Sequence, residues 1–243
     1  MTTGTLSQTQ AVICRTSTRR VAYFAAKRTI DVSVALVLLV VVSPLLLVAC
    51  VLVVIDGGRP LFFRQDRIRG RRDGHGSWVL ESFTLFKLRT MVVDADSSLH
   101  QAYMTAYIRG DQHGLRALRP DRRDGESFRP GRDPRLTRVG QVLRRLSIDE
   151  LPQLWNVIRG DMSLVGPRPP MPYEVDLYSD RDLLRLTTPQ GITGWAQIKG
   201  RSAVAFPELI GRDLEYLEHQ SIGFDLKVML LTVPAVLSRR GAD

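Results

Sequence analysis

The stretch VSVALVLLVVVSPLLLVACVLVVI, residues 32–55, decides the class of fold because its 24 residues include no charged side chain. A helix of that length measures about 36 Å, more than the roughly 30 Å hydrocarbon core of a bilayer. A signal peptide is a poor fit, since the apolar run is too long and no convincing small-residue cleavage site follows it. A buried core helix is a poor fit as well, because every face of the segment is apolar. The stretch therefore predicts a membrane helix.

Whether this helix crosses the bilayer depends on its centre and its flanks. Pro44, which follows Ser43, removes one backbone donor and clashes with the preceding turn, so we expect a kink or break there. Basic residues favour the cytoplasmic side, and here five lie between positions 15 and 28 and six arginines lie between 59 and 72. A re-entrant helix that returns to the cytoplasmic face satisfies both flanks and is the favoured interpretation. A plain crossing is the alternative.

The composition of the chain limits the classes of molecule that it is expected to bind. The 243 residues carry a net charge of +9 and give a pI near 10.1, which suits anionic lipid headgroups, a phosphate-rich substrate or nucleic acid. The basic residues are spread along the chain rather than gathered in one arm, so no nucleic-acid partner is expected. Two cysteines, Cys14 and Cys50, argue against a disulfide framework and favour a reducing, cytoplasmic location.

The chain divides into tails, a membrane helix and one domain. The first residues are polar and rich in Thr, Ser and Arg, which is typical of disorder. Residues 109–134 are rich in Gly, Arg, Asp and Pro without a hydrophobic period, and they predict a mobile loop. The predicted organisation is a polar tail at 1–21, the re-entrant helix at 22–56, a cytosolic domain at 57–238 and a tail at 239–243.

Within the domain, strand and helix patterns are both present. Residues 61–68 and 78–91 read as strands around the turn-rich 70–77, which predicts a β-hairpin. Helices are expected over 94–108, around 136–146 and around 151–158. The apolar stretch 224–237 is either a core helix or a helix in the membrane interface. The predicted fold is an α+β monotopic membrane protein with a kinked re-entrant helix, a β-hairpin and a small helical domain with interfacial helices.

The adjacent carboxylates Asp149 and Glu150 are the main candidates for chemistry. A helix N-terminus would keep Asp149 ionised, and a carboxylate can attack phosphorus to form an acyl phosphate. Mg²⁺ commonly binds through one or two carboxylates plus phosphate oxygens, so this pair could also supply a metal ligand. The structural alternative is a helix cap. Ser147-x-x-Glu150 is a capping-box pattern, and Asp149 as the cap would place Pro152 within the first turn.

Several cations could hold phosphate near that pair. Arg144 precedes it, and Arg168 lies in a Gly-Pro-Arg-Pro turn whose prolines would fix its direction for bidentate phosphate binding. Lys87 and Arg89 are two apart in a predicted strand and would share one face. Arg201 ends a glycine-spaced segment, 191–201, that is compatible with a loop around a ligand. The alternative for each is a solvated or ion-paired residue without a ligand.

In order and spacing, these motifs resemble the bacterial sugar transferase family, small monotopic phosphoglycosyl transferases that begin the assembly of cell-surface glycans. The pairing of SIDELPQL with GDMSLVGPRP is the most specific part of the resemblance. The matching segments, which span about 27–237, are KRTIDV (27–32), Ser43-Pro44, FFRQ (62–65), FKLRTM (86–91), DPRLTRVG (133–140), LRRLSIDELPQLWNVIRGDMSLVGPRP (143–169) and GITGWAQIKGR (191–201).

The resemblance implies a reaction and its partners. Asp149, as nucleophile and Mg²⁺ ligand, would attack the β-phosphate of a UDP-sugar, UMP would leave, and polyprenyl (undecaprenyl) phosphate would then take the phosphosugar. Glu150 would assist proton handling or acceptor activation, and Lys87, Arg144 and Arg168 would hold phosphates or the nucleotide. The enzyme would work at the cytoplasmic face of the bacterial inner membrane, with the lipid bilayer as a further partner. A homodimer is compatible with the sequence.

Two other functions stay open at this point. A membrane-associated glycosyl transferase would release UDP rather than UMP, and a membrane-anchored binding protein would need neither Mg²⁺ nor Asp149. Ser202, where family members often have Asn, and the long basic segment 109–134 depart from the family pattern and leave the donor sugar open. No four-helix membrane region precedes the matching segments, so we expect an enzyme with a single core.

Overall fold

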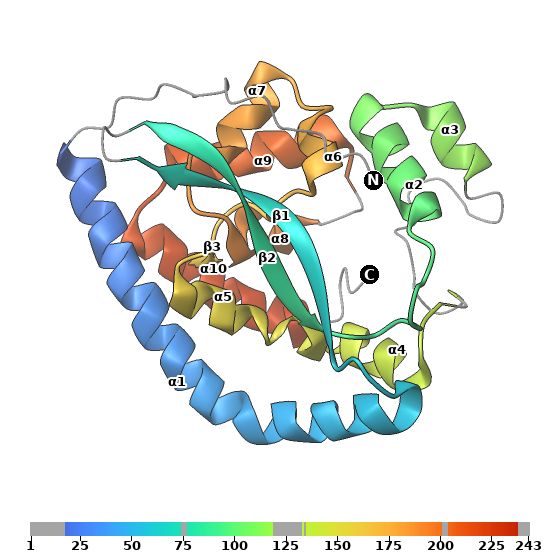
Figure 1. Cartoon of the computed structure of the whole chain (residues 1–243). Coiled ribbons are helices and arrows are strands. Elements are labelled where there is room, and N and C mark those ends of the chain that lie inside the picture. The colour runs from blue at the N-terminus through green and yellow to red at the C-terminus, as the bar shows by residue number, and fades with distance from the viewer. Residues whose placement is uncertain (1–17, 74–76, 119–132, 134, 201–203, 238–243) are drawn as a thin grey trace.

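A computed structural model gives the arrangement of the chain and describes residues 18–73, 77–118, 133, 135–200 and 204–237. One long helix, α1 (Thr18–Gly57), lies along the side and base of a mixed helix-and-sheet domain (Figure 1). The domain begins with a hairpin of β1 (Phe62–Arg72) and β2 (Trp78–Leu88). The predicted mixture of helix and sheet is confirmed.

The remaining elements are mostly short. In chain order they are α2 (Ser98–Arg109), α3 (Gln112–Ala117), α4 (Arg138–Arg145), the 3-10 helix η2 (Ile148–Glu150), α5 (Gln153–Arg159), β3 (Ser163–Val165), α6 (Pro172–Val175), α7 (Asp180–Leu183), the 3-10 helix η3 (Leu184–Leu186), β4 (Gly191–Thr193), α8 (Trp195–Lys199), α9 (Phe206–Glu218) and α10 (Ile222–Leu237).

The helix α1 runs unbroken through Ser43 and Pro44. Proline cannot donate to the carbonyl of Val40, but the Ser43 hydroxyl donates to that carbonyl at 2.8 Å. Figure 1 shows that α1 changes direction partway along its length. The helix therefore does not end at Ser43-Pro44, because the hydroxyl replaces the lost donor, and the re-entrant kink predicted there stays a prediction. The helix also begins earlier than predicted, since 18–21 belong to α1, while 1–17 lie outside the described residues.

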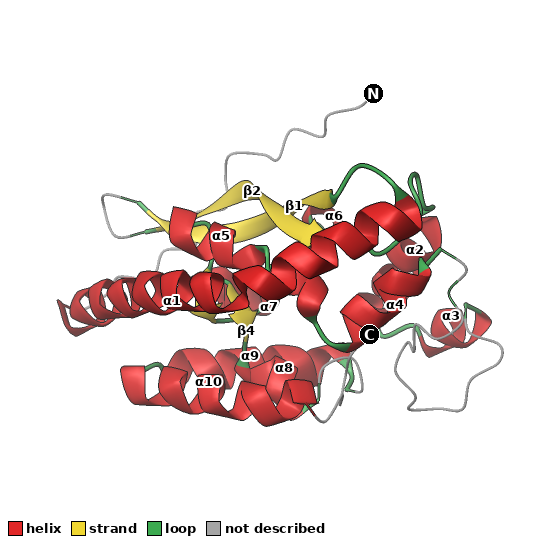
Figure 2. Cartoon of the chain, turned by 90° about the horizontal axis from the view of Figure 1, so that it is seen from below, coloured by secondary structure: helices red, strands yellow, loops and turns green. Residues whose placement is uncertain are grey.

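Both ends of α1 pack against the same domain. Near its start, Lys27 Nζ lies 3.0 Å from Asp225 Oδ2 on α10. Near its end, Asp56 Oδ2 accepts a hydrogen bond of 2.8 Å from the backbone N–H of Val139 on α4. Figure 2 shows α1 crossing the underside of the domain lengthwise, with the hairpin and α5 on one side and α8, α9 and α10 on the other. The two ends are therefore fixed to one body.

The part of α1 between these contacts leaves apolar side chains uncovered. Val40, Val41, Leu47 and Ile55 are each more than 65% exposed, and by length and composition α1 could cross a membrane. The helix α10 adds to the exposed apolar surface through Leu230, Leu231 and Val233, although Val228 on its other face is completely buried. For 224–237, the core interpretation describes the face with Val228, and the membrane-interface interpretation stays a prediction for the exposed face.

The hydrophobic core joins α1 to the domain. Ala35 of α1 packs in one cluster with Phe83 of β2, Val157 of α5, Val165 of β3 and Val228 of α10, and each is at most 7% exposed. The hairpin is antiparallel and pairs Phe62 with Leu88 and Arg72 with Trp78. The predicted hairpin is confirmed, and its length spans the domain (Figure 1).

Two short features differ from the sequence predictions. The expected loop at 109–134 contains helix α3, where Asp111 Oδ1 accepts a hydrogen bond from Gly114 N at 2.9 Å and caps the helix. That part of the loop prediction is wrong, and 119–132 lie outside the described residues. The strands β3 and β4 pair in parallel, Ser163 with Gly191. Strands of three residues are too short for a recognisable alternation, so the sequence does not predict them.

Candidate active site

The carboxylates Asp149 and Glu150 lie in η2, directly before α5. Ser147 precedes them at φ 55°, in the left-handed region that residues other than glycine rarely adopt, and its side chain makes no capping hydrogen bond. The N-cap of α5 is Pro152. Neither Ser147 nor Asp149 therefore caps α5, and both capping interpretations are wrong.

Asp149 and Glu150 have different surroundings. Asp149 is only 5% exposed, yet its carboxylate accepts no hydrogen bond from the described residues. Glu150 Oε1 accepts hydrogen bonds from Lys87 Nζ at 2.9 Å and from both Nη atoms of Arg168 at 3.2 Å. One carboxylate is thus held between two cations while its neighbour is buried and available.

The charges around the pair are coupled. Burial raises the pKa of Asp149, and Lys87, Arg144 and Arg168 oppose that rise, while Glu150 adds to it. Burial also lowers the pKa of Lys87, against the influence of Glu150, and Glu150 raises the pKa of Arg168. Three cations act on two adjacent carboxylates, so the positive charge is in excess and would favour the binding of a further anion.

The position of Arg144 follows from a close contact between α4 and the end of β2. A Cβ atom on Gly140 would lie 2.1 Å from the carbonyl oxygen of Thr90, so only glycine lets the helix approach this closely. Arg144 Nε then donates to Thr90 Oγ1 at 2.8 Å, and its charge influences Asp149. The predicted grouping of Lys87, Arg144 and Arg168 around the carboxylate pair is found in the structure.

The other two predicted phosphate-binding residues are not in this group. Arg89 is buried and donates to the carbonyls of Gly57 and Gly58 at 2.5 and 2.6 Å and of Arg59 at 3.1 Å, which completes the C-terminal end of α1. The expected shared face with Lys87 is wrong, because β2 ends at Leu88 and the strand alternation stops there. Arg201 lies outside the described residues.

Sequence reasoning missed Arg67 of β1. Its guanidinium is buried, donates to Gln65 Oε1 at 2.7 and 3.1 Å, and donates to the carbonyl of Pro169 at 2.9 Å. Burial and the neighbouring Arg168 lower the pKa of Arg67 to about 10. The signal that could have found Arg67 is its place in a strand register that puts its side chain inward, next to the matched segment FFRQ.

His100 of α2 was also missed. Burial and then Arg67, Arg135, Arg144 and Arg168 lower the pKa of its side chain to about 4. His100 is therefore neutral beside a group of arginines. An isolated histidine in a helix carries no sequence pattern that would reveal this.

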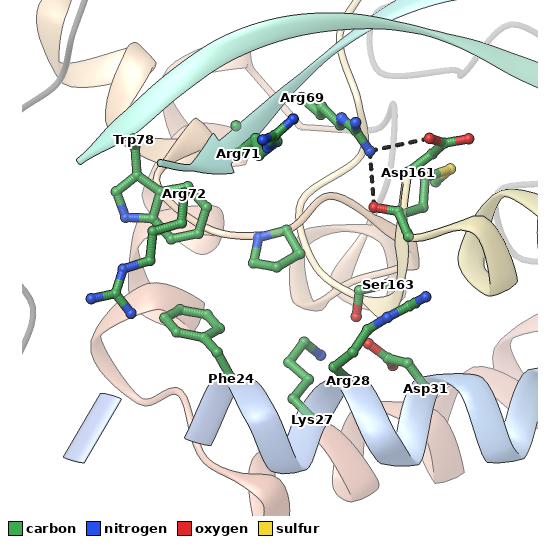
Figure 3. Close-up of a pocket in the computed structure, with 14 residues that line it drawn as sticks. Phe24, Lys27, Arg28, Asp31, Arg69, Arg71, Arg72, Trp78, Asp161 and Ser163 are labelled. Carbon is green, nitrogen blue, oxygen red and sulfur yellow. Dashed lines mark hydrogen bonds and ion pairs between the residues drawn. The ribbon is translucent and has the colours of Figure 1, made fainter. Parts of the chain in front are cut away.

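A separate cavity of about 180 Å³ lies at the other end of the hairpin, between the first turns of α1 and the strands (Figure 3). Its cations are matched by acids and carbonyls. Lys27 pairs with Asp225, and Arg69 donates to Asp161 at 3.2 Å and to the carbonyl of Gly160 at 2.8 Å. Asp161 is thus engaged there, and the cavity contains none of the predicted site residues.

Comparison with known proteins identifies the family. The model of the bacterial sugar transferase family matches residues 22–239. The exopolysaccharide production protein ExoY of Rhizobium meliloti is 38% identical over 221 residues, which cover 89% of this chain and 88% of the relative. The UDP-glucose:undecaprenyl-phosphate glucose-1-phosphate transferase of Caulobacter vibrioides is 38% identical over 231 residues, covering 92% of this chain and 74% of the relative. The undecaprenyl-phosphate galactose phosphotransferase of Salmonella typhimurium is 34% identical over 216 residues, covering 89% of this chain and 41% of the relative. This chain therefore belongs to the bacterial sugar transferase family.

Proposed function

We propose that this protein transfers a sugar-1-phosphate from a UDP-sugar to polyprenyl phosphate and releases UMP. The names of the Caulobacter and Salmonella relatives support undecaprenyl phosphate as acceptor, and the name of the Rhizobium relative supports a role in exopolysaccharide production. The observation that carries the proposal is the buried Asp149 carboxylate, which accepts no hydrogen bond from the described residues, beside Glu150 and its two cations.

The proposed reaction has two displacements at one phosphorus atom. A carboxylate oxygen of Asp149 forms a bond to the β-phosphorus of the UDP-sugar, the bond from that phosphorus to the bridging oxygen breaks, and UMP leaves with the electron pair. A phosphate oxygen of the polyprenyl phosphate then attacks the same phosphorus, and the Asp149 carboxylate leaves. The products are UMP and a polyprenyl diphosphate sugar, with no net proton needed.

The neighbouring charged residues bind the phosphates and hold one another in place. Lys87, Arg144 and Arg168 bind the phosphate oxygens of donor and acceptor, where fixed cations stabilise the charge that develops during transfer. Glu150 accepts from Lys87 and Arg168, so its first role in this proposal is to hold those two cations beside Asp149. The substrate site consists of Lys87, Arg144 and Arg168 without Arg89.

The donor set fits Mg²⁺. The described residues contain no group of three or more His, Cys, Asp or Glu side chains that could hold a metal alone. Magnesium, however, often uses one or two carboxylates and completes its ligands with substrate phosphate and water. Asp149 would be the protein ligand, with Glu150 adjacent. When bound, Mg²⁺ would neutralise phosphate charge and favour attack at phosphorus.

We also propose that the protein is monotopic, with α1 entering and leaving the cytoplasmic leaflet. A helix that crossed the bilayer would place its ends on opposite sides, but Lys27 and Asp56, near opposite ends of α1, both contact the same domain. The exposed apolar side chains of α1 and α10 would lie among the lipids. This arrangement brings a lipid phosphate and a soluble nucleotide sugar to one site at the bilayer surface.

The test is the identity of the released nucleotide. Purified protein in nanodiscs with undecaprenyl phosphate and Mg²⁺ is given UDP-glucose, UDP-galactose and N-acetylated UDP-sugars separately. Release of UMP with one of them supports the proposal and identifies the donor. Release of UDP would instead indicate an ordinary glycosyl transferase, and release of no nucleotide would favour a binding protein. Without acceptor, mass spectrometry should find the phosphosugar on the peptide that contains Asp149.

A further inference from the structure

The turn that carries Arg168 depends on donors from other parts of the chain. Residues 167, 169 and 170 are prolines, which have a backbone carbonyl but no N–H group. The carbonyl oxygens of this segment therefore need hydrogen-bond donors from elsewhere in the chain. Backbone N–H groups serve two of the carbonyls, since Gly191 donates to Pro167 and Ile68 donates to Pro170, each at 2.9 Å. The two carbonyls between them, those of Arg168 and Pro169, receive hydrogen bonds from arginine side chains.

One of these arginines is Arg185, in η3. Its Nη2 donates to the carbonyl oxygen of Arg168 at 3.1 Å. The same guanidinium donates from Nε to Asp213 Oδ2 on α9 at 2.8 Å and from Nη1 to Tyr178 Oη at 2.8 Å, and its Nη2 lies 2.7 Å from Asp213 Oδ2 in an ion pair. Arg185 is 4% exposed and Asp213 is 2% exposed. A planar, buried group therefore ties α9 and the segment around Tyr178 to the peptide unit of Arg168.

The contribution of a buried ion pair to the free energy of unfolding is small, so the pair between Arg185 and Asp213 points to a role other than stability. Removing two charges from water costs about as much as their attraction returns, and apolar residues of similar volume often stabilise a fold equally well. The hydrogen bond from Arg185 to Arg168 is a contact that such residues could not make. A shift of that carbonyl would move the Cα atom of Arg168 and with it the side chain, whose guanidinium lies 3.2 Å from Glu150.

We propose that Arg185, braced by Asp213, is a positioning residue that fixes the direction of Arg168 in the substrate site. Arg185 acts through Arg168 and does not touch the substrate. The inference rests on the proposed function, because it assigns Arg168 to the binding of substrate phosphate. Displacement of a binding group by about 1 Å can cost up to a hundredfold in rate, so the expected effect is large.

The primary variant is Arg185→Lys, which keeps a cation beside Asp213 but cannot reach Asp213, Tyr178 and the Arg168 carbonyl together. We expect it to fold and to lose between about tenfold and a hundredfold in kcat/KM. The matched control is Arg69→Lys. Arg69 also donates to an aspartate and to a backbone carbonyl, but at the far end of the hairpin, so its variant should keep nearly normal kcat/KM. Equal losses in both variants would overturn the proposal.

A double-mutant cycle separates positioning from a general structural role. In an Arg168→Ala background, Arg185→Lys should have almost no further effect on kcat/KM or on the affinity for UDP measured by calorimetry. Effects that multiply independently would overturn the proposal. The affinity for UDP needs no turnover, so the cycle can be read even if the wild-type protein releases no UMP and the proposed function fails.

A second variant guards against misfolding. The double substitution Arg185→Met with Asp213→Leu removes both buried charges at similar volume, so the protein should still fold, with a melting temperature lowered only by the unpaired Arg168 carbonyl and Tyr178 hydroxyl. Since it also lacks the bond to Arg168, we expect its kcat/KM to be as low as that of Arg185→Lys. A stable double variant with normal kcat/KM would contradict the assignment.

Discussion

Asp149 is the residue on which the proposed chemistry depends, and its surroundings predict what its replacement does. The variant Asp149→Asn keeps the shape of the side chain but cannot form the acyl phosphate, so UMP release should fall by roughly a thousandfold or more. Because the buried carboxylate accepts no hydrogen bond from the described residues, the neutral amide should not lower the melting temperature. UMP release and thermal melting of the purified variant measure both effects.

The control for this substitution is an acidic residue away from the site. Asp176→Asn removes an exposed carboxylate at the end of α6 and should leave turnover unchanged. Near-normal turnover in Asp149→Asn would show that Asp149 is not the nucleophile. Loss of melting temperature together with turnover would show that the carboxylate supports the fold.

His100 predicts a pH dependence at the residue scale. Burial and four arginines lower its pKa to about 4, whereas the ordinary value is 6.5, so the unfolded chain binds a proton between these pH values that the folded chain does not. Its contribution to stability therefore decreases as the pH falls from 6.5 to 4. In NMR titrations, one of the four histidines should stay neutral until about pH 4, and His100→Gln should remove that signal.

Ligand binding should change this titration in a known direction. UDP would neutralise part of the arginine charge, favour the imidazolium and raise the pKa of His100. His219, the C-cap residue of α9, is the internal reference: its ring contacts the Glu215 carbonyl and Phe224 rather than these arginines, so its signal should not respond to UDP. A His100 signal that titrates near 6.5 without ligand would contradict the described surroundings.

At the scale of single residues, the sequence predicted the group that shares a motif and missed the residues that act through tertiary contacts. Asp149, Glu150 and Arg168 lie within one matched segment, so their grouping with Lys87 could be expected. Arg67 donates to the Pro169 carbonyl and Arg185 donates to Asp213, partners that lie far away in sequence, and no spacing pattern identifies such partners. The prediction for Arg89 was wrong because two residues share a strand face only while the strand continues.

At the scale of elements, the central turns of α1 carry the next prediction. The Ser43 hydroxyl supplies the donor that Pro44 cannot give to the Val40 carbonyl. In an apolar surrounding, Ser43→Ala would leave that carbonyl unpaired, at a cost of about 1–3 kcal/mol. We expect a lower melting temperature for Ser43→Ala in nanodiscs and recovery in Ser43→Thr, whose hydroxyl can make the same bond.

The same helix offers a control. Ser33 is exposed on α1 and donates to no described carbonyl, so Ser33→Ala should leave the melting temperature unchanged. If Ser33→Ala and Ser43→Ala melted at the same temperature, the hydrogen bond from Ser43 to Val40 would not stabilise the helix. Recovery in Ser43→Val, which has no hydroxyl, would lead to the same conclusion.

Periodicity predicted the long elements and could not predict the short ones. The apolar run of α1, the alternation in the hairpin and the helical spacing in α4 and α5 each extend over enough residues to be recognised. The three-residue strands β3 and β4 form because their partners are present, and α3 depends on a single Asp111 cap. Pro44 predicts a kink or break, but it does not show that α1 continues past it, which depends on the hydrogen bond of the Ser43 hydroxyl.

At the scale of the whole molecule, the attachment of both ends of α1 to one domain predicts the membrane topology. In a background with Cys14 and Cys50 replaced by Ser, the variants Arg20→Cys and Arg59→Cys place one exposed thiol before and one after the apolar segment. If α1 is re-entrant, a membrane-impermeant maleimide should label both thiols in inverted inner-membrane vesicles and neither in intact spheroplasts. A crossing helix would instead expose one thiol in each preparation.

The variant Pro44→Ala restores the backbone donor to Val40 and should straighten α1. The labelling pattern of a crossing helix should then increase, and UMP release should decrease. Labelling of the two thiols from opposite sides in the background without Pro44→Ala would contradict the monotopic proposal, since the domain contacts of Lys27 and Asp56 could not then form together.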